Sequence, residues 1–92
     1  MPVTAESLER SVEILRSHGA TRVLVFGSAK DSPDTARDLD LACAGLTPRA
    51  FLDSVGDLLD VMDIAVDLID LSERSAFTEF VEDNGRVLYE RD

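Results

Sequence analysis

Two aspartates separated by one residue, Asp38 and Asp40, are the residues whose type and spacing most directly suggest chemistry. They lie in the segment DLDLACA, which alternates polar and apolar residues as a half-buried strand does. Residues two apart in a strand point to the same face, so the two carboxylates project together while Leu39 and Leu41 project to the other side. Adjacent carboxylates repel each other unless a cation lies between them or one is protonated. Because Mg²⁺ prefers carboxylate, water and phosphate oxygens, the pair predicts a magnesium site.

A third carboxylate is expected from the segment IAVDLIDL at residues 64–71, which reads as another strand. Asp67 lies between Val66 and Leu68, so it faces away from the side that those apolar residues bury. Asp70 shares the side of Val66 and Leu68, and Asp63 lies about 13 Å from Asp67 along the chain. An acidic residue inside an apolar strand is costly without a counter-ion or a function. We therefore predict Asp67 as the third ligand.

The turn Gly27-Ser28 follows the apolar segment VLVF and is a candidate phosphate site. Glycine lets a backbone approach a phosphate closely, and the serine hydroxyl and nearby N–H groups can donate to it. Lys30 could reach the same phosphate as a point charge. Each of these features alone is common. Their combination in one chain, a Gly-Ser turn after a strand, an Asp-x-Asp strand and a later Asp-bearing strand, is far more specific.

The elements that must position these residues follow from the hydrophobic pattern. Thr4 and Thr47 are expected to cap two helices, and Ser72 is expected to cap a third. Phe77 and Phe80 are read as core residues of that third helix, with the alternative that part of this side is left for a partner. We expect helices at about 5–18, 48–61 and 73–84, strands at 21–26, 38–44 and 64–71, a loop at 29–37, and a short strand or extended tail in RVLYE. The order is α-β-β-α-β-α-β, with the first two strands antiparallel and the third parallel to a neighbour. This predicts a single α+β domain over residues 1–92, with a small mixed β-sheet and helices on one face or both.

Charge narrows the range of partners. The chain has 19 Asp and Glu against 9 Lys and Arg, a formal net charge of −10, which disfavours direct nucleic-acid binding and anionic membranes. One cysteine, Cys43, excludes an internal disulfide and a cysteine-rich zinc site. No apolar run approaches the roughly 20 residues of a membrane span, and the first residues lack the apolar region of a signal peptide. We expect a cytoplasmic protein.

The segments VLVFGSAK, DLDLA and VDLI, with the closing EDNGRVLYE, together resemble the DNA polymerase β-like nucleotidyltransferase superfamily. They look most like the minimal nucleotidyltransferases, the MNT proteins of prokaryotes. The resemblance implies the polymerase β-like fold. By position, Gly27 and Ser28 match the turn that grips the triphosphate. Asp38 and Asp40 match the first two metal ligands, and Asp67 matches the carboxylate that helps activate the attacking hydroxyl.

The resemblance also implies a reaction and a partner. Relatives of this kind use two Mg²⁺ ions and commonly act as the antitoxin of a pair with a helical HEPN toxin, an RNase. The implied activity is protein adenylyltransfer, in which AMP passes from ATP to a tyrosine of the toxin and pyrophosphate leaves. The −10 charge would suit a basic partner.

The chain departs from the family pattern around the turn. Asp31 stands where a second glycine is common, the loop is one residue shorter, and Arg37 stands where serine is common before Asp38. These differences motivate a second hypothesis, a catalytically weak module that neutralises its partner by binding alone. A third is a nucleotidyltransferase that acts on a small molecule held by a separate subunit.

Overall fold

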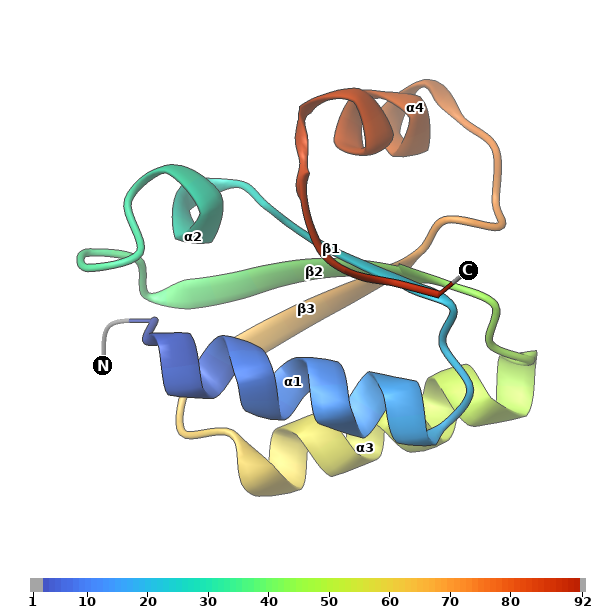
Figure 1. The fold of residues 1–92 in the computed structure, drawn as a ribbon, viewed down its shortest axis with the longest axis horizontal. Helices are drawn as coiled ribbons and strands as arrows, with labels where there is room; N and C mark the ends of the chain where they lie inside the picture. The colour runs from blue at the N-terminus through green and yellow to red at the C-terminus, as the bar shows by residue number, and fades with distance from the viewer. Residues whose placement is uncertain (1–2, 92) are drawn as a thin grey trace.

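The computed structural model describes residues 3–91, which form one four-stranded mixed sheet with helices on both sides (Figure 1). No helix in this range is both long enough and apolar enough to cross a membrane. In chain order the elements are α1 (Ala5–Ser17), β1 (Arg22–Phe26), α2 (Ser28–Asp31), β2 (Asp38–Ala44), α3 (Pro48–Val61), β3 (Ala65–Asp70), α4 (Ala76–Asn84) and β4 (Arg86–Glu90).

The strand order across the sheet is β3-β2-β1-β4. β1 is antiparallel to both β2 and β4, whereas β2 and β3 are parallel and are joined by the crossover helix α3. The predicted antiparallel pairing of the first two strands and the parallel third strand are both confirmed. The closing segment RVLYE is a strand at the edge of the sheet and not a loose tail.

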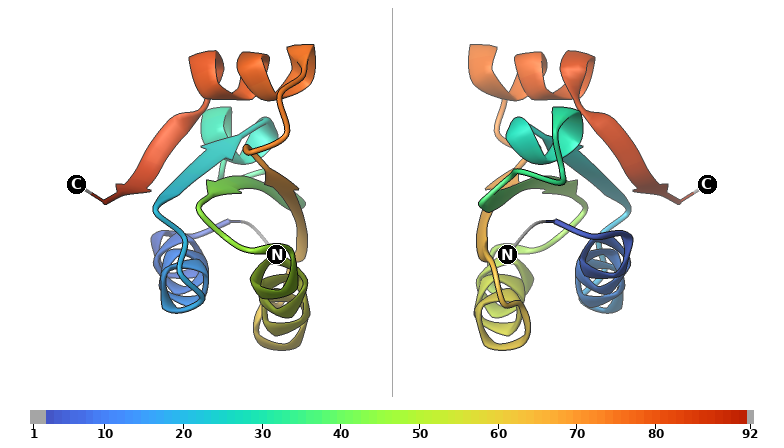
Figure 2. Two further views of the ribbon diagram at one scale, coloured as in Figure 1. Left: turned by 90° about the vertical axis from the view of Figure 1, so that its right-hand side faces the viewer. Right: turned by 90° about the vertical axis from the view of Figure 1, so that its left-hand side faces the viewer.

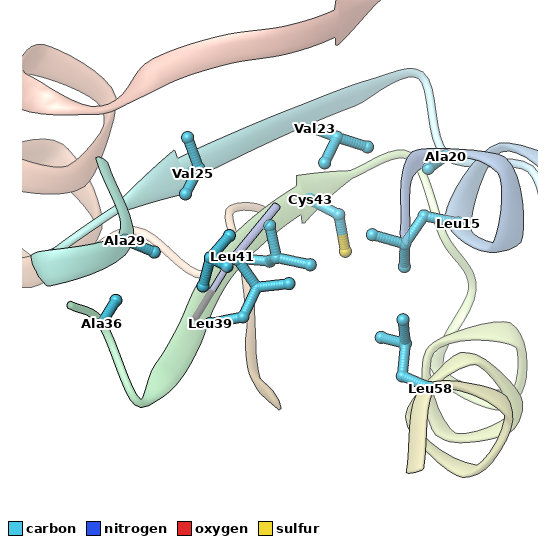
Figure 3. Close-up of a cluster of buried hydrophobic side chains, with 11 residues drawn as sticks. Leu15, Ala20, Val23, Val25, Ala29, Ala36, Leu39, Leu41, Cys43 and Leu58 are labelled. Atoms are coloured by element: carbon cyan, nitrogen blue, oxygen red, sulfur yellow. The ribbon is translucent and has the colours of Figure 1, made fainter. Parts of the chain in front are cut away.

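The two faces of the sheet are covered differently (Figure 2). α1 and α3 lie side by side under one face, α4 crosses the other face, and α2 lies beyond the end of β1 on the same side as α4. The larger core fills the α1–α3 side, where alternate residues of the central strands meet the helices (Figure 3). Its fully buried members include Val23, Val25, Leu39 and Leu41 from the sheet and Leu58 from α3. This burial pins the strand register, since a slip of one residue would turn Asp38 and Asp40 into the core.

A smaller core on the opposite face holds α4 in place. It consists of Leu24, Ala42, Leu71 and Val81, with Phe26 and Ile69 packed against it. By strand parity this is the face that carries Asp40 and Asp67. α4 therefore covers only part of this face, and the carboxylates lie on the remainder.

One expected loop contains a helical turn. Residues 28–31 form α2, in which Lys30 donates its backbone N–H to the carbonyl of Gly27 at 3.1 Å. Ser32 in turn donates to the carbonyl of Ser28 at 2.7 Å. The turn is stabilised by the complete burial of Ala29 against the core, a tertiary contact that local periodicity does not reveal. The rest of the predicted loop remains a connection to β2.

The start of the last helix was predicted wrongly at Ser72. α4 begins at Ala76 and its N-cap is Ser75, whose hydroxyl accepts the N–H of Thr78 at 3.2 Å while Thr78 Oγ1 accepts the N–H of Ser75 at 2.9 Å. This reciprocal capping box satisfies two backbone donors at once. Ser72 instead donates its N–H to Oδ1 of Asp70 at 2.9 Å in the turn after β3.

The prediction that Phe77 and Phe80 are core residues was also wrong. They are 54% and 60% exposed, whereas Thr78 and Val81 are the buried residues of α4. Thr78 can be buried because the capping box satisfies its hydroxyl. The helix therefore turns a small polar residue and a valine inward and leaves two aromatic rings at the surface.

Candidate metal and nucleotide site

The centre of the candidate site is a pair of aspartates on neighbouring parallel strands. Asp40 of β2 and Asp67 of β3 are register partners, so their side chains leave the sheet side by side on the same face. Asp38 lies two residues earlier on that face, opposite Ala65, and is exposed at the start of β2. The structure thus brings Asp40 and Asp67 together and places Asp38 beside them at the rim.

The surroundings of Asp40 disfavour its negative charge. The pKa of Asp40 is raised above its ordinary value of 3.8, first by burial and then by the charges of Asp67 and Asp38. A hydrogen bond with the Asp67 side chain, which only a protonated carboxyl can donate, raises the pKa further. None of the ion pairs formed within residues 3–91 involves these three carboxylates. The cluster therefore concentrates negative charge that a bound cation would neutralise.

The Gly27 turn packs directly against this cluster. Gly27 has a positive φ of 70°, and a Cβ atom built on it would lie 2.5 Å from Oδ2 of Asp40. Only glycine relieves both the backbone strain and this clash. The close approach brings Ser28, the first residue of α2, to the edge of the acidic pair. A phosphate held by the turn would lie next to the carboxylates.

Lys30 is engaged locally. Its ammonium group lies 3.6 Å from the carboxylate of Asp31. Because Asp31 is 73% exposed, the pair contributes little stability and can be exchanged for another anion at small cost. The predicted role of Lys30 in phosphate binding is compatible with this position and stays a prediction.

The donor set of the cluster consists of carboxylate oxygens alone. No group of three or more His, Cys, Asp or Glu residues within residues 3–91 is already arranged around a common point. The carboxylates of Asp40 and Asp67 lie side by side, whereas Asp38 lies on the same face of the sheet two residues earlier. An all-carboxylate set that keeps places open for water and phosphate suits Mg²⁺, and the glycine cradle leaves the space that a side chain would fill. The residues present therefore fit Mg²⁺, with Asp38, Asp40 and Asp67 as the ligands to be tested.

Asp63, the alternative third carboxylate, lies elsewhere. It lines a cavity of about 230 Å³ between the start of α1 and the end of α3, together with Thr4, Ser7 and Met62. Asp63 also precedes β3, which begins at Ala65. The choice of Asp67 over Asp63 agrees with this placement.

One neighbour of the site was not anticipated from the sequence. Phe26 is the register partner of Asp40 across β1 and β2, and its ring meets that of Phe77 edge to face at a centroid distance of 6.0 Å. The sequence feature that could have indicated Phe26 is its position immediately before Gly27. Its contact with α4 depends on the tertiary fold and could not be read from the sequence.

Comparison with known proteins identifies the fold. The sequence matches no protein-family model and no curated protein. Among solved structures, a chain of a toxin–antitoxin complex with AMP-PNP aligns with a TM-score of 0.75 and 23% identity, over 92% of this chain and 74% of that one. A MntA–HepT toxin–antitoxin mutant, in which two aspartates one residue apart are replaced by glutamate, gives 0.73 and 21%, over 92% and 74%.

A third match is the tri-AMPylated Shewanella oneidensis HEPN toxin in complex with its MNT antitoxin. It aligns with a TM-score of 0.70 and 22% identity, over 92% of this chain and 71% of that chain. The chain therefore shares its fold with a chain of these toxin–antitoxin complexes, and the predicted α+β architecture is confirmed. At this level of identity the similarity concerns the fold and leaves the chemistry to be argued from the residues.

Proposed function

We propose that this protein is a Mg²⁺-dependent nucleotidyltransferase that acts as the antitoxin of a HEPN/MNT pair. The observation that carries the proposal is the packing of Gly27 against Asp40, with Asp67 in register beside it. A turn able to hold phosphate thereby borders carboxylates able to hold magnesium, as triphosphate chemistry requires. The solved complexes of the same fold include one with AMP-PNP and one with an AMPylated toxin, which supports this assignment.

Each site residue has a defined part in the proposed reaction. Asp38, Asp40 and Asp67 would hold two Mg²⁺ ions, which supply charge neutralisation of the triphosphate and acidify the acceptor hydroxyl. Gly27 and Ser28 would orient the phosphates by backbone and hydroxyl hydrogen bonds, and Lys30 would add a positive charge. Asp67, the more exposed member of the central pair, would face the acceptor and receive its proton. The acceptor oxygen then bonds to the α-phosphorus of ATP, and the bond to the β-phosphate oxygen breaks to release pyrophosphate.

The proposed acceptor is a tyrosine of a HEPN toxin partner. Four of the matched structures carry MNT or MntA together with a HEPN or HepT toxin in one complex, which supports a partner of this class. The net charge of −10 suits a basic RNase-like protein and would speed its association. We place the pair in the cytoplasm, where ATP is available and the single buried thiol of Cys43 stays reduced.

The intact mass of the partner tests the proposal. The protein is co-expressed with a HEPN toxin, purified as a complex and incubated with ATP and Mg²⁺. We expect the toxin mass to increase by one or more AMP units, and we expect no increase with the Asp38→Asn, Asp40→Asn variant. An unchanged toxin mass with the unaltered protein contradicts adenylyltransfer.

Neutralisation by binding alone is the second candidate function. It is favoured by the incomplete convergence of the three carboxylates and by the pairing of Lys30 with Asp31. The Asp38→Ala, Asp40→Ala variant separates the two functions in a toxicity assay. Full protection from the toxin by this variant would support binding alone, and loss of protection with an intact complex would support catalysis.

A further inference from the structure

An aromatic surface lies on the same face of the sheet as the carboxylates. Phe77 and Phe80 of α4 are 54% and 60% exposed, in a chain with only four phenylalanines and one tyrosine. They are three residues apart on the helix and thus neighbours along one side of it. Two of the five aromatic rings therefore remain at the surface.

A short chain of contacts connects this surface to the candidate site. Phe77 meets Phe26 edge to face at 6.0 Å and 78°, and Phe26 is the register partner of Asp40. With neighbouring strands about 4.8 Å apart, the Phe77 ring lies on the order of 10 Å from the acidic pair. Phe26 is also followed directly by Gly27. Phe77 therefore contacts the residue that directly precedes the phosphate turn, and α2 and α4 lie on the same side of the sheet (Figure 2).

We propose that Phe77 and Phe80 form a stacking platform for the base of the bound nucleotide. This inference rests on the proposed function, because it assumes that the triphosphate lies between Gly27–Ser28 and the aspartates. A nucleotide held there by its phosphates has its ribose and base within reach of α4. Every nucleobase presents a π-face, so an aromatic platform can stack on any of the bases. It contributes affinity without selecting strictly for one base.

Charge on α4 argues that the platform receives the base and not the phosphates. α4 carries three acidic residues, Glu79, Glu82 and Asp83, and no lysine or arginine of its own, and Glu82 pairs with Arg22 and Arg74 from outside the helix. Phosphate groups would be repelled from this helix and drawn to the metal end of the site. The nucleotide is thereby oriented, with its anionic end at Gly27 and its aromatic end at Phe77.

Binding measurements with two ligands isolate the contribution of the base. Titration calorimetry is performed in Mg²⁺ with AMP-PNP and, separately, with inorganic tripolyphosphate, which has no base. We expect the Phe77→Ala, Phe80→Ala variant to bind AMP-PNP roughly tenfold more weakly or worse, and tripolyphosphate as before. A Phe77→Trp, Phe80→Trp variant retains the stacking faces and should keep the original affinity for AMP-PNP.

Two further variants control for folding and for general loss of apolar surface. Phe77→Leu, Phe80→Leu retains the apolar packing but removes the π-faces, so it should reproduce the loss even if the alanine variant folds poorly. Leu52→Ala, Leu59→Ala removes two residues of α3 that are 68% and 65% exposed, and should change neither affinity. The α3 helix lies under the opposite face of the sheet (Figure 1).

The outcomes separate this inference from the proposed function. If the unaltered protein binds neither ligand, the proposed function fails and the platform fails with it. If it binds both, but the alanine and leucine variants bind AMP-PNP as tightly as the unaltered protein, the platform alone is overturned. Loss of the HEPN complex in these variants, with unchanged AMP-PNP binding, would instead identify the surface as a protein-docking site and likewise overturn the inference.

Discussion

Asp40 and Asp67 occupy the same register on adjacent parallel strands, and their side chains come close enough to share a hydrogen bond when one is protonated. This arrangement is unfavourable for the free protein, because two carboxylates compete for one partly buried position. The fold tolerates it because the large core on the other face fixes both strands. The repulsion between Asp40 and Asp67 lowers the stability of the free protein, which supports a role for the pair in binding a cation.

The first consequence concerns pH. Folding raises the pKa of Asp40 from its ordinary value of 3.8, so the native state holds a proton that the unfolded chain releases. The free energy of unfolding should therefore decrease as pH rises from about 3.8 through the raised pKa of Asp40, and the penalty is complete above that pKa. Asp40→Asn removes the charge and lets the amide donate to Asp67. We expect a higher melting temperature for this variant at pH 7 in EDTA.

Asp34→Asn is the matched control for this measurement, because Asp34 is an exposed loop residue outside the cluster. It should leave the melting temperature nearly unchanged at pH 7. A decrease in stability on Asp40→Asn at pH 7 would contradict the view that this carboxylate is retained at a cost to folding.

Binding of Mg²⁺ should offset the destabilisation caused by the repulsion between Asp40 and Asp67. A ligand that binds only the folded protein stabilises it by RT ln(1 + [L]/Kd), which is about 1.4 kcal/mol at ten times Kd. For a domain of this size such a gain corresponds to a rise of roughly 5–10 °C in melting temperature. We expect this shift for the unaltered protein, and a much smaller one for Asp40→Asn and Asp67→Asn. Asp63→Asn should retain it, since Asp63 lines the cavity next to α1. Equal shifts in Asp63→Asn and Asp67→Asn would argue against the assignment of the third ligand.

Strand parity explains why the acidic face could be predicted from the sequence. Asp38 and Asp40 alternate with Leu39 and Leu41, and a period of two leaves one arrangement in which the leucines are buried. The same reasoning placed Asp67 opposite to Val66 and Leu68. Register between strands is a tertiary property, so the sequence indicated a shared face but could not show that Asp40 and Asp67 are direct partners.

The errors have physical reasons of the same kind. α2 exists because Ala29 is buried against two strands, and a single helical turn has no periodicity to detect. Phe77 and Phe80 have core-forming side chains, yet Thr78 and Val81 are the buried residues of α4, which starts three residues later than predicted. Which side of a short helix faces the sheet depends on tertiary packing, so the sequence alone could not show it.

Substitution of the two serines before α4 tests which of them caps the helix. Ser75→Ala removes the hydroxyl that accepts the N–H of Thr78 and should lower the free energy of unfolding by about 1 kcal/mol. Ser72→Ala keeps the backbone N–H that donates to Asp70 and should change stability by less than about 0.5 kcal/mol. Urea unfolding measures both. A larger loss for Ser72→Ala than for Ser75→Ala would place the cap where the sequence suggested.

Substitution of glycine by alanine should change the free energy of unfolding in opposite directions at Gly27 and at Gly56. Gly27→Ala forces a residue with a side chain to a φ of 70° and places its Cβ 2.5 Å from Oδ2 of Asp40, so we expect a loss of about 1–3 kcal/mol together with weaker tripolyphosphate binding in Mg²⁺. Gly56→Ala lies within α3 with nothing within 4 Å of the new Cβ, and should raise stability by about 0.5–1 kcal/mol without affecting binding. Denaturant unfolding and calorimetry test the pair together. If Gly27→Ala were tolerated like Gly56→Ala, the turn would have room that the structure denies it, and its role in holding phosphate against the carboxylates would lose its geometric basis.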